Sequence, residues 1–81
     1  MVDTRIAPRY RINKPAFAEY GGDKYPCLVR DLSTTGAALE FSDGNLASIA
    51  TAFTLVIPDE GLRLPCHVVW KRKYRMDVAF D

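Results

Sequence analysis

The sequence predicts an all-β fold of six short antiparallel strands, a β-barrel or a sandwich, with at most one short helical turn. Segments rich in β-branched and aromatic residues alternate with a period of two, as half-buried strands do. Clusters of Gly, Pro, Asp and Asn separate these segments at intervals of about eight to twelve residues. The chain has 81 residues, which is the size of one domain. Closure into a barrel is favoured because it leaves no long strand edge unpaired.

Three strands are expected in the first half of the chain. Residues 12–20 form the first strand and end at residues 21–23, a Gly-Gly-Asp turn that is typical of a β-hairpin. Residues 24–30 form the returning strand, with an irregular start because Pro26 has no backbone N–H. After a polar loop, residues 37–41 alternate between inward apolar side chains and outward small or polar ones.

Three more strands complete the barrel in the second half. Residues 46–50 are too few for a secure strand, and we expect a single helical turn there. Residues 51–57 are β-branched and aromatic, and the strand ends at the Pro-Asp-Glu-Gly turn of residues 58–61. Residues 62–72 form the longest strand, and residues 75–80 form the last one.

The period-two alternation also predicts which side chains fill the barrel. Trp70 is in phase with Cys66 and Val68, so we expect it in the core. His67 is out of phase and belongs at the surface. Cys27 and Cys66 lack a Cys-x-x-Cys partner and the chain has one histidine, so we expect buried free thiols and no metal site. The predicted core consists of Phe17, Cys27, Val29, Leu39, Phe41, Phe53, Leu55, Val68, Trp70, Val78 and Phe80.

Charge is unevenly distributed along a chain whose net charge is only +1. Residues 1–14 hold four basic and one acidic residue, residues 15–62 hold two and seven, and residues 63–81 hold five and two. Nucleic-acid binders usually carry a larger basic excess, so this balance favours a small anionic ligand. No apolar run reaches the roughly 18 residues of a spanning helix, and the N-terminus has no signal-peptide core, so we expect a cytoplasmic protein without membrane contact.

Two arginines, Arg5 and Arg9, lie four positions apart near the N-terminus. Pro8 lacks a backbone donor and disfavours helical geometry in the residue before it. We therefore expect residues 1–11 to form a flexible arm and residues 12–81 to form the barrel. Two guanidinium groups on such an arm can converge on one anionic, planar ligand, because their donors match phosphate oxygens and the edge of a guanine.

A polar loop between two apolar segments contains Asp31, Ser33 and Gly36. The short side chains of Asp31 and Ser33 can bond to the backbone just ahead, and Gly36 can adopt a positive φ at little steric cost. Taken alone, an Asp-x-Ser-x-x-Gly pattern is more often a well-formed turn between strands than a ligand-binding loop. The nearby arginines favour the second interpretation.

Together, Arg5-x-x-x-Arg9 and Asp31-x-Ser33-x-x-Gly36 resemble the signature of the PilZ domain family, whose members are bacterial receptors for the second messenger cyclic di-GMP. The resemblance implies the same six-stranded antiparallel β-barrel, of the split-barrel type. It also implies a receptor domain that converts cyclic di-GMP binding into an altered surface for a downstream protein partner.

The same resemblance implies a role for each motif residue. The arm would swing over the barrel when the ligand arrives, and Arg5 and Arg9 would bond its phosphates and a guanine edge. Asp31 and Ser33 would satisfy the other guanine and the phosphate–ribose ring. Gly36 would permit the turn that presents them.

Residues 68–70 and 76–80 resemble the closing hairpin of that family, so the likeness covers nearly the whole chain. Arg11 is a candidate for an additional phosphate contact. Trp70 is a candidate platform for a stacked base, although its phase favours the core. Family members usually carry a glycine where Asp77 stands, so a negative side chain is expected near the ligand face.

The sequence contains no catalytic set, since it has no nucleophile with a base and no carboxylate pair in contrasting environments. We therefore predict no enzyme activity and no cofactor apart from the ligand. Two alternatives to a receptor stay open. The first is an adaptor of the same fold that binds proteins and not cyclic di-GMP. The second is a small nucleic-acid binder that would use the arm and the basic corner at residues 71–75.

Overall fold

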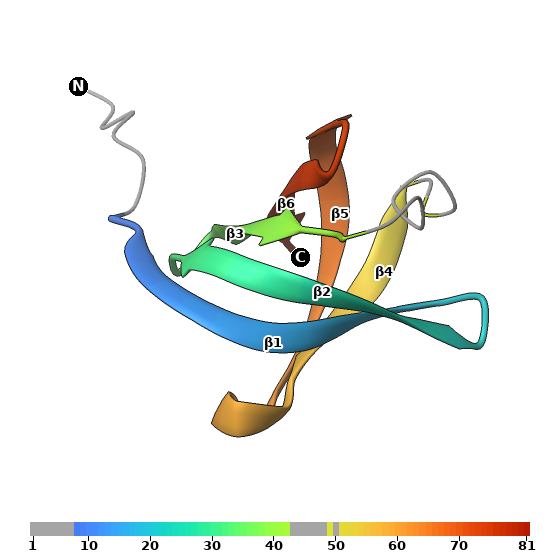
Figure 1. Ribbon diagram of the computed structural model, residues 1–81, viewed down its shortest axis with the longest axis horizontal. Helices are drawn as coiled ribbons and strands as arrows, with labels where there is room; N and C mark the ends of the chain where they lie inside the picture. Colours follow the sequence, from blue (N-terminus) through green and yellow to red (C-terminus); the bar gives the residue numbers. More distant parts are fainter. Residues whose placement is uncertain (1–7, 43–48, 50) are drawn as a thin grey trace.

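The computed structural model describes residues 8–42, 49 and 51–81, which form a closed antiparallel barrel (Figure 1). The strands neighbour one another in the order β1-β2-β3-β6-β5-β4, and β4 pairs again with β1. The predicted six-stranded antiparallel barrel is confirmed. Its elements are β1 (Tyr10–Tyr20), β2 (Asp23–Leu32), β3 (Gly36–Glu40), β4 (Ala52–Ile57), the 3₁₀ turn η2 (Pro58–Glu60), β5 (Leu62–Arg72) and β6 (Arg75–Phe80).

The predicted hairpin between the first two strands is present, and both strands are longer than expected. Gly21 and Gly22 have φ values of 62° and 86°, the left-handed geometry that a two-residue hairpin turn requires. At the other end of the hairpin, Arg11 pairs with Asp31. The arginine therefore lies in β1 and not in the arm, and the aspartate lies in β2 before the polar loop begins.

An irregularity in β1 lets one strand pair with two neighbours. The register between β1 and β2 shifts between Arg11 and Lys14, where Asn13 adopts a φ of 49°. Such a bulge bends a strand and increases its twist. Beyond the bend β1 pairs with β4 as well as β2, which closes the barrel.

The expectation that Phe17 belongs to the core is wrong, because β1 has the opposite phase. Ala16 and Ala18 are buried, whereas Phe17 is 36% exposed. Ala18 lies directly opposite Leu55 of β4, which is fully buried, so a small inward side chain faces a large one. All three neighbouring residues of β1 are apolar, and alternation alone could not decide which face points inward.

A single apolar cluster fills the interior. Six predicted members are buried: Val29, Leu39, Phe41, Phe53, Leu55 and Val78. Three more pack partly buried against the cluster: Cys27, Val68 and Phe80. The buried residues outside that predicted list are Ala16, Ala18, Ala37, Ile49, Ile57, Cys66 and Met76, and they include Cys66, the thiol that is expected to be buried.

The expectation that Trp70 lies in the core is also wrong. On β5, Val68 pairs with Val78 but Trp70 pairs with Asp77, so Val69 is an extra residue in the ladder. A bulge of this kind reverses the inward and outward phase beyond it. Trp70 consequently points outward beside Asp77 and is 49% exposed.

The remaining predictions fall on the loops and on isolated side chains. The helical turn expected at residues 46–50 lies outside the described residues, apart from Ile49, which is buried. His67 is exposed as expected, and both cysteines are free thiols. Within the described ranges, no helix is long and apolar enough to cross a membrane.

Candidate functional site

The register of five strands places five residues in one row across the outside of the barrel. Arg11 pairs with Asp31, Asp31 with Ala38, Ala38 with Asp77, and Asp77 with Trp70. Directly paired residues share a face of the sheet. The neighbouring interior positions are occupied by buried side chains, which confirms that this row faces outward. We call it the outer row.

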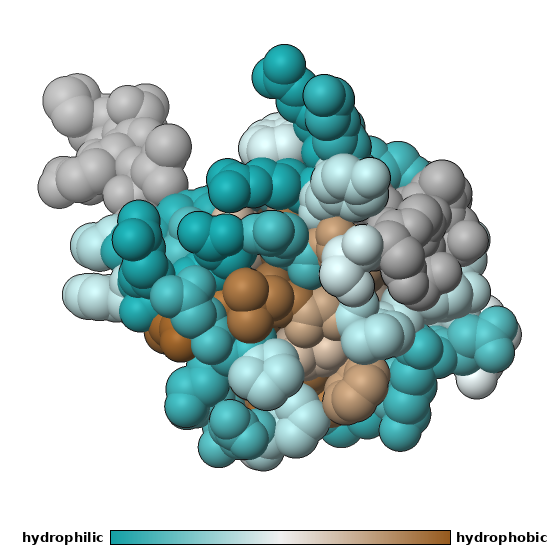
Figure 2. All heavy atoms as spheres, in the orientation of Figure 1, coloured by the Kyte–Doolittle hydropathy of each residue, from teal (hydrophilic) through white to brown (hydrophobic). Residues whose placement is uncertain are grey.

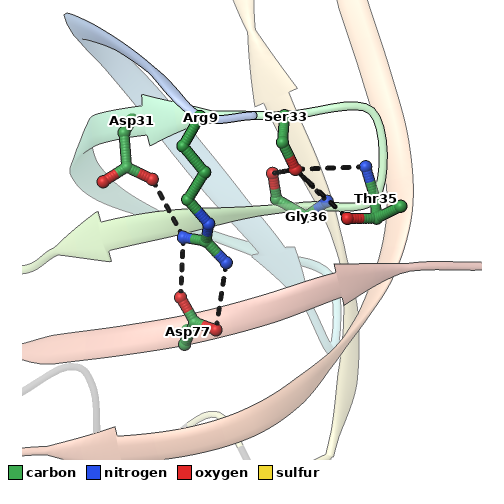
Figure 3. A network of polar contacts seen from close by, with 6 residues as sticks. All are labelled: Arg9, Asp31, Ser33, Thr35, Gly36 and Asp77. Carbon is green, nitrogen blue, oxygen red and sulfur yellow. Dashed lines mark hydrogen bonds and ion pairs between the residues drawn. The ribbon is translucent and has the colours of Figure 1, made fainter. Parts of the chain in front are cut away.

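Arg9, the residue just before β1, reaches across the outer row. Its Nη1 donates hydrogen bonds to Asp31 Oδ1 at 2.9 Å and to Asp77 Oδ1 at 3.0 Å, and its Nη2 donates to Asp77 Oδ2 at 3.3 Å. Figure 3 shows the guanidinium between the two carboxylates, which come from β2 and β6. Ala38 of β3 lies between those strands in the row, and its small side chain leaves room for Arg9 above it.

These contacts are charge-assisted and partly exposed to solvent. The side chains of Arg9, Asp31 and Asp77 keep 31%, 32% and 19% of their accessible surface, so Asp77 is the more buried acceptor. The hydrogen bond with Asp77 is the main cause that raises the pKa of Arg9; partial burial opposes the shift and the bond with Asp31 adds to it. Arg9 is therefore a permanent cation whose position is fixed by two carboxylates.

Ser33 stabilises the turn between β2 and β3 through hydrogen bonds of its side chain. Its Oγ accepts hydrogen bonds from the backbone N–H groups of Thr35 at 3.2 Å and of Gly36 at 3.1 Å, as Figure 3 shows. The hydroxyl also lies 3.2 Å from both the Gly36 carbonyl and Thr35 Oγ1, either of which can accept its proton. The Ser33 residue is 8% exposed. Its first role is therefore to hold the loop in shape.

Gly36 is required for a different reason from the one expected. It is not among the described residues with a positive φ. Instead, a Cβ added at Gly36 would overlap the backbone carbonyl oxygen of Val78 on β6. A side chain here would push β3 and β6 apart, because the obstacle is backbone and cannot rotate away. Glycine is therefore needed at this position because β3 and β6 approach each other closely next to the polar turn.

A hollow of about 170 Å³ lies beside the Arg9 contacts. Both candidates for additional contacts, Arg11 and Trp70, line it together with Asp31. Arg30 and Arg75 also line the hollow, although the sequence did not mark them as site residues. Arg30 occupies the bulge of β2 between Val29 and Asp31, and its Nη1 is bonded to Glu40.

A second, larger hollow of about 430 Å³ lies at the β5–β6 hairpin. Trp70 and Arg75 border both hollows. The hairpin has exposed aromatic side chains, with Trp70 49% and Tyr74 56% exposed, among basic residues. Figure 2 shows hydrophilic side chains projecting at the top of the view, where Figure 1 places this hairpin. The outer face therefore combines guanidinium groups with flat aromatic surface.

The structure brings most of the predicted site residues to one region. Arg9 and Asp31 are in direct contact, and Ser33 with Gly36 forms the turn beside them. Arg5 lies outside the described residues. Asp77, expected only as a negative charge near the ligand face, is bonded to Arg9. Arg30 lines the hollow because of the bulge in β2, and Arg75 lines it because of the register of the β5–β6 hairpin. The spacing of residues in the sequence reveals neither feature.

The described part of the chain contains no group of three or more His, Cys, Asp or Glu side chains that could hold a metal ion. The polar groups gathered on the outer row are instead guanidinium groups, two carboxylates and an indole. These groups are suited to hydrogen bonding and stacking with a planar anionic molecule.

The fold and the site define a small β-barrel domain that carries a cluster of polar side chains on its outer face. The model of the PilZ domain family matches residues 3–81, essentially the whole chain. The chain belongs to the PilZ domain family, a family of receptor domains for cyclic di-GMP. A search of the curated proteins finds no match.

Proposed function

We propose that this protein binds cyclic di-GMP on the outer row of its barrel and transmits binding through a change in that surface. One observation carries the proposal. Arg9 and Asp31 come from the two halves of the family signature, 22 positions apart, and they meet in a hydrogen bond of 2.9 Å. Residues from the two halves therefore lie at one place, next to a hollow lined by further arginines and an indole.

Each group at this place matches a feature of the ligand. The Arg9 guanidinium presents paired donors to a phosphate or to the O6/N7 edge of a guanine, and Arg5 would add a second set. The Asp31 carboxylate only accepts hydrogen bonds, so it needs a donor on the ligand. A guanine has N–H groups that can donate to it, whereas an ionised phosphate has none. Ser33 and Gly36 contribute by fixing the turn that follows Asp31.

Two further residues extend the contact surface. Trp70 offers an exposed ring beside Asp77, on which a base can stack for about 1–3 kcal/mol. Arg11, directly opposite Asp31, adds a positive charge to the same hollow. Stacking between cationic side chains and rings also favours a guanine dinucleotide over a simple phosphate.

The output of the receptor would be read at the β5–β6 hairpin by a protein partner in the cytoplasm. Val69, Trp70 and Tyr74 expose 55%, 49% and 56% of their surface there. Large exposed apolar side chains next to basic ones are typical of protein contact surfaces. Ligand bound in the hollow at Trp70 would change this surface directly.

An adaptor that binds a protein without cyclic di-GMP is the second candidate function. The same exposed hairpin favours it, since that surface exists without any ligand. The two functions differ in what occupies Arg9. In an adaptor, the contacts of Arg9 with Asp31 and Asp77 would be permanent, whereas in a receptor they would be exchanged for contacts with the ligand.

Isothermal titration calorimetry with cyclic di-GMP, GMP and a single-stranded oligonucleotide tests the proposal. We expect saturable binding of cyclic di-GMP, much weaker binding of GMP, and weak, salt-sensitive binding of the oligonucleotide. Asp31→Ala should reduce cyclic di-GMP affinity, and Glu19→Ala should not, since Glu19 pairs with Arg63 outside the outer row. No binding of cyclic di-GMP by the parent protein would refute the receptor function and favour the adaptor.

A further inference from the structure

The guanidinium that is expected to bind the ligand is already occupied. Nη1 of Arg9 has two hydrogens, and it donates to two carboxylates, Asp31 and Asp77. Nη2 donates to the second oxygen of Asp77, so that this carboxylate engages both terminal nitrogens. A phosphate binds a guanidinium in the same way, with two of its oxygens accepting hydrogen bonds from the two terminal nitrogens. Asp77 thus occupies the position of an anionic ligand on Arg9.

Of the two carboxylates, Asp77 makes the more extensive contact with Arg9. It supplies two of the three hydrogen bonds, and its side chain is the less exposed, at 19% against 32% for Asp31. The proposed function gives Asp31 a further role with a guanine, but it gives Asp77 none.

We infer that Asp77 is an affinity-setting residue: it holds Arg9 in the ligand-free protein and competes with the phosphate of cyclic di-GMP for the same guanidinium. This inference rests on the proposed function. The ligand must separate Arg9 from Asp77 before it can use both terminal nitrogens. The domain then responds only above a ligand concentration that the carboxylate sets.

The competition has a second component once Arg9 has moved to the ligand. Asp77 lies two strands from Asp31, about 10 Å across the sheet. After release it would be an unpaired carboxylate beside a ligand with two phosphate charges, at a separation comparable to the Debye length of about 8–10 Å at 0.1–0.15 M salt. Its repulsion lowers the affinity in addition to the contacts that are lost. A neutral side chain of the same shape would remove both effects.

Asp77→Asn is the variant that tests this inference, since the amide is almost isosteric and carries no charge. We expect its affinity for cyclic di-GMP in calorimetry to be about three- to thirtyfold higher than that of the parent, with the larger gain at low salt. Asp77→Glu keeps the charge and should stay near the parent value. Asp59→Asn is the matched control: it removes a carboxylate from η2, far from β6 in Figure 1, and should change nothing.

A ligand-free measurement accompanies the titration. If Asp77 holds Arg9, the amide hydrogens of Arg9 and Tyr10 should exchange faster in Asp77→Asn than in the parent or in Asp59→Asn. Faster exchange together with tighter ligand binding supports the inference.

Three results would overturn the inference. Unchanged affinity in Asp77→Asn would show that the contact does not compete with the ligand. Weaker affinity would show that Asp77 contacts the ligand itself. In both cases the parent binds cyclic di-GMP, so the proposed function stands while the inference fails. No binding by the parent would refute the proposed function and the competition together.

Discussion

The backbone of Gly36 lies against the backbone carbonyl of Val78, so closely that no Cβ fits between β3 and β6. This approach sits behind the Ser33 turn, where the Phe80 N–H donates to the Thr35 carbonyl at 2.8 Å. The turn that follows Asp31 is therefore fastened to β6, the strand that carries Asp77. The contacts between Gly36 and Val78 and between Phe80 and Thr35 therefore fix both the packing of β3 against β6 and the position of the turn beside Asp31.

Gly36→Ala should destabilise the protein, because the added methyl group meets backbone that cannot rotate away. We expect a loss of about 2 kcal/mol or more in the free energy of unfolding. For a domain of this size that corresponds to a fall in melting temperature of roughly 10 °C, measured by thermal denaturation. Gly21→Asn is the control, since a Cβ there meets nothing and asparagine tolerates its φ of 62°. A melting temperature of Gly36→Ala equal to that of the control would contradict the close approach.

The positions of the strands along the chain and most of the core could be predicted from the sequence because alternation and turn residues are local signals. The failures share a physical cause. At Phe17, neighbouring alanines made both faces of the strand apolar, and only the opposed Leu55 decided which one points inward. At Trp70, a one-residue bulge reversed the phase, and a bulge depends on the partner strand as well as on its own sequence.

The site was predicted in part for related reasons. The family resemblance grouped Arg9 with Asp31, and the structure places the two in contact. The residues that complete the outer face come from strands distant in sequence. Asp77 meets Arg9 only because β6 lies next to β3 in the barrel. No local pattern marks such a pair, since it follows from the closed strand order.

Trp70→Ala should have little effect on stability, in contrast to substitution of a core residue. Trp70 is half exposed, so we expect a loss of at most about 1 kcal/mol, against about 2–5 kcal/mol for Leu39→Ala, which removes a fully buried side chain. Urea denaturation of the two variants measures the difference. A loss in Trp70→Ala as large as that in Leu39→Ala would mean that the indole is in the core after all. If Trp70 stacks on a base, its variant should lose ligand affinity while staying folded.

The two thiols should make the protein less stable at alkaline pH. Burial raises the pKa of both Cys27 and Cys66 to about 12. In the unfolded chain thiols ionise near pH 9, so between about pH 9 and 12 the unfolded state releases protons that the folded state retains. The free energy of unfolding should therefore fall as the pH rises through this range and be unaffected by the thiols below it.

Urea denaturation at pH 8 and at pH 10 checks this dependence. Other groups also titrate in this range, so a Cys27→Ala/Cys66→Ala double variant is the reference, and its stability should fall less steeply. In the folded parent at pH 8, alkylation of the thiols by iodoacetamide should be at least about a hundredfold slower than in the denatured chain. Equal alkylation rates in the two states would refute the raised pKa values.

Replacement of Arg9 separates its planar hydrogen-bonding geometry from its charge. Arg9→Ala should reduce cyclic di-GMP affinity about ten- to a hundredfold, the equivalent of roughly 1.5–3 kcal/mol for charge-assisted bonds. Arg9→Lys keeps the positive charge but cannot donate to two oxygens in one plane, so it should restore only a small part of the loss. Because the contacts of Arg9 are partly exposed, either variant should lose at most about 1 kcal/mol of stability. Arg63→Ala, which breaks the ion pair with Glu19 elsewhere on the barrel, is the matched control and should bind like the parent. Calorimetry with thermal melts measures both quantities, and full affinity in Arg9→Lys would show that charge alone, and not the guanidinium geometry, recognises the ligand.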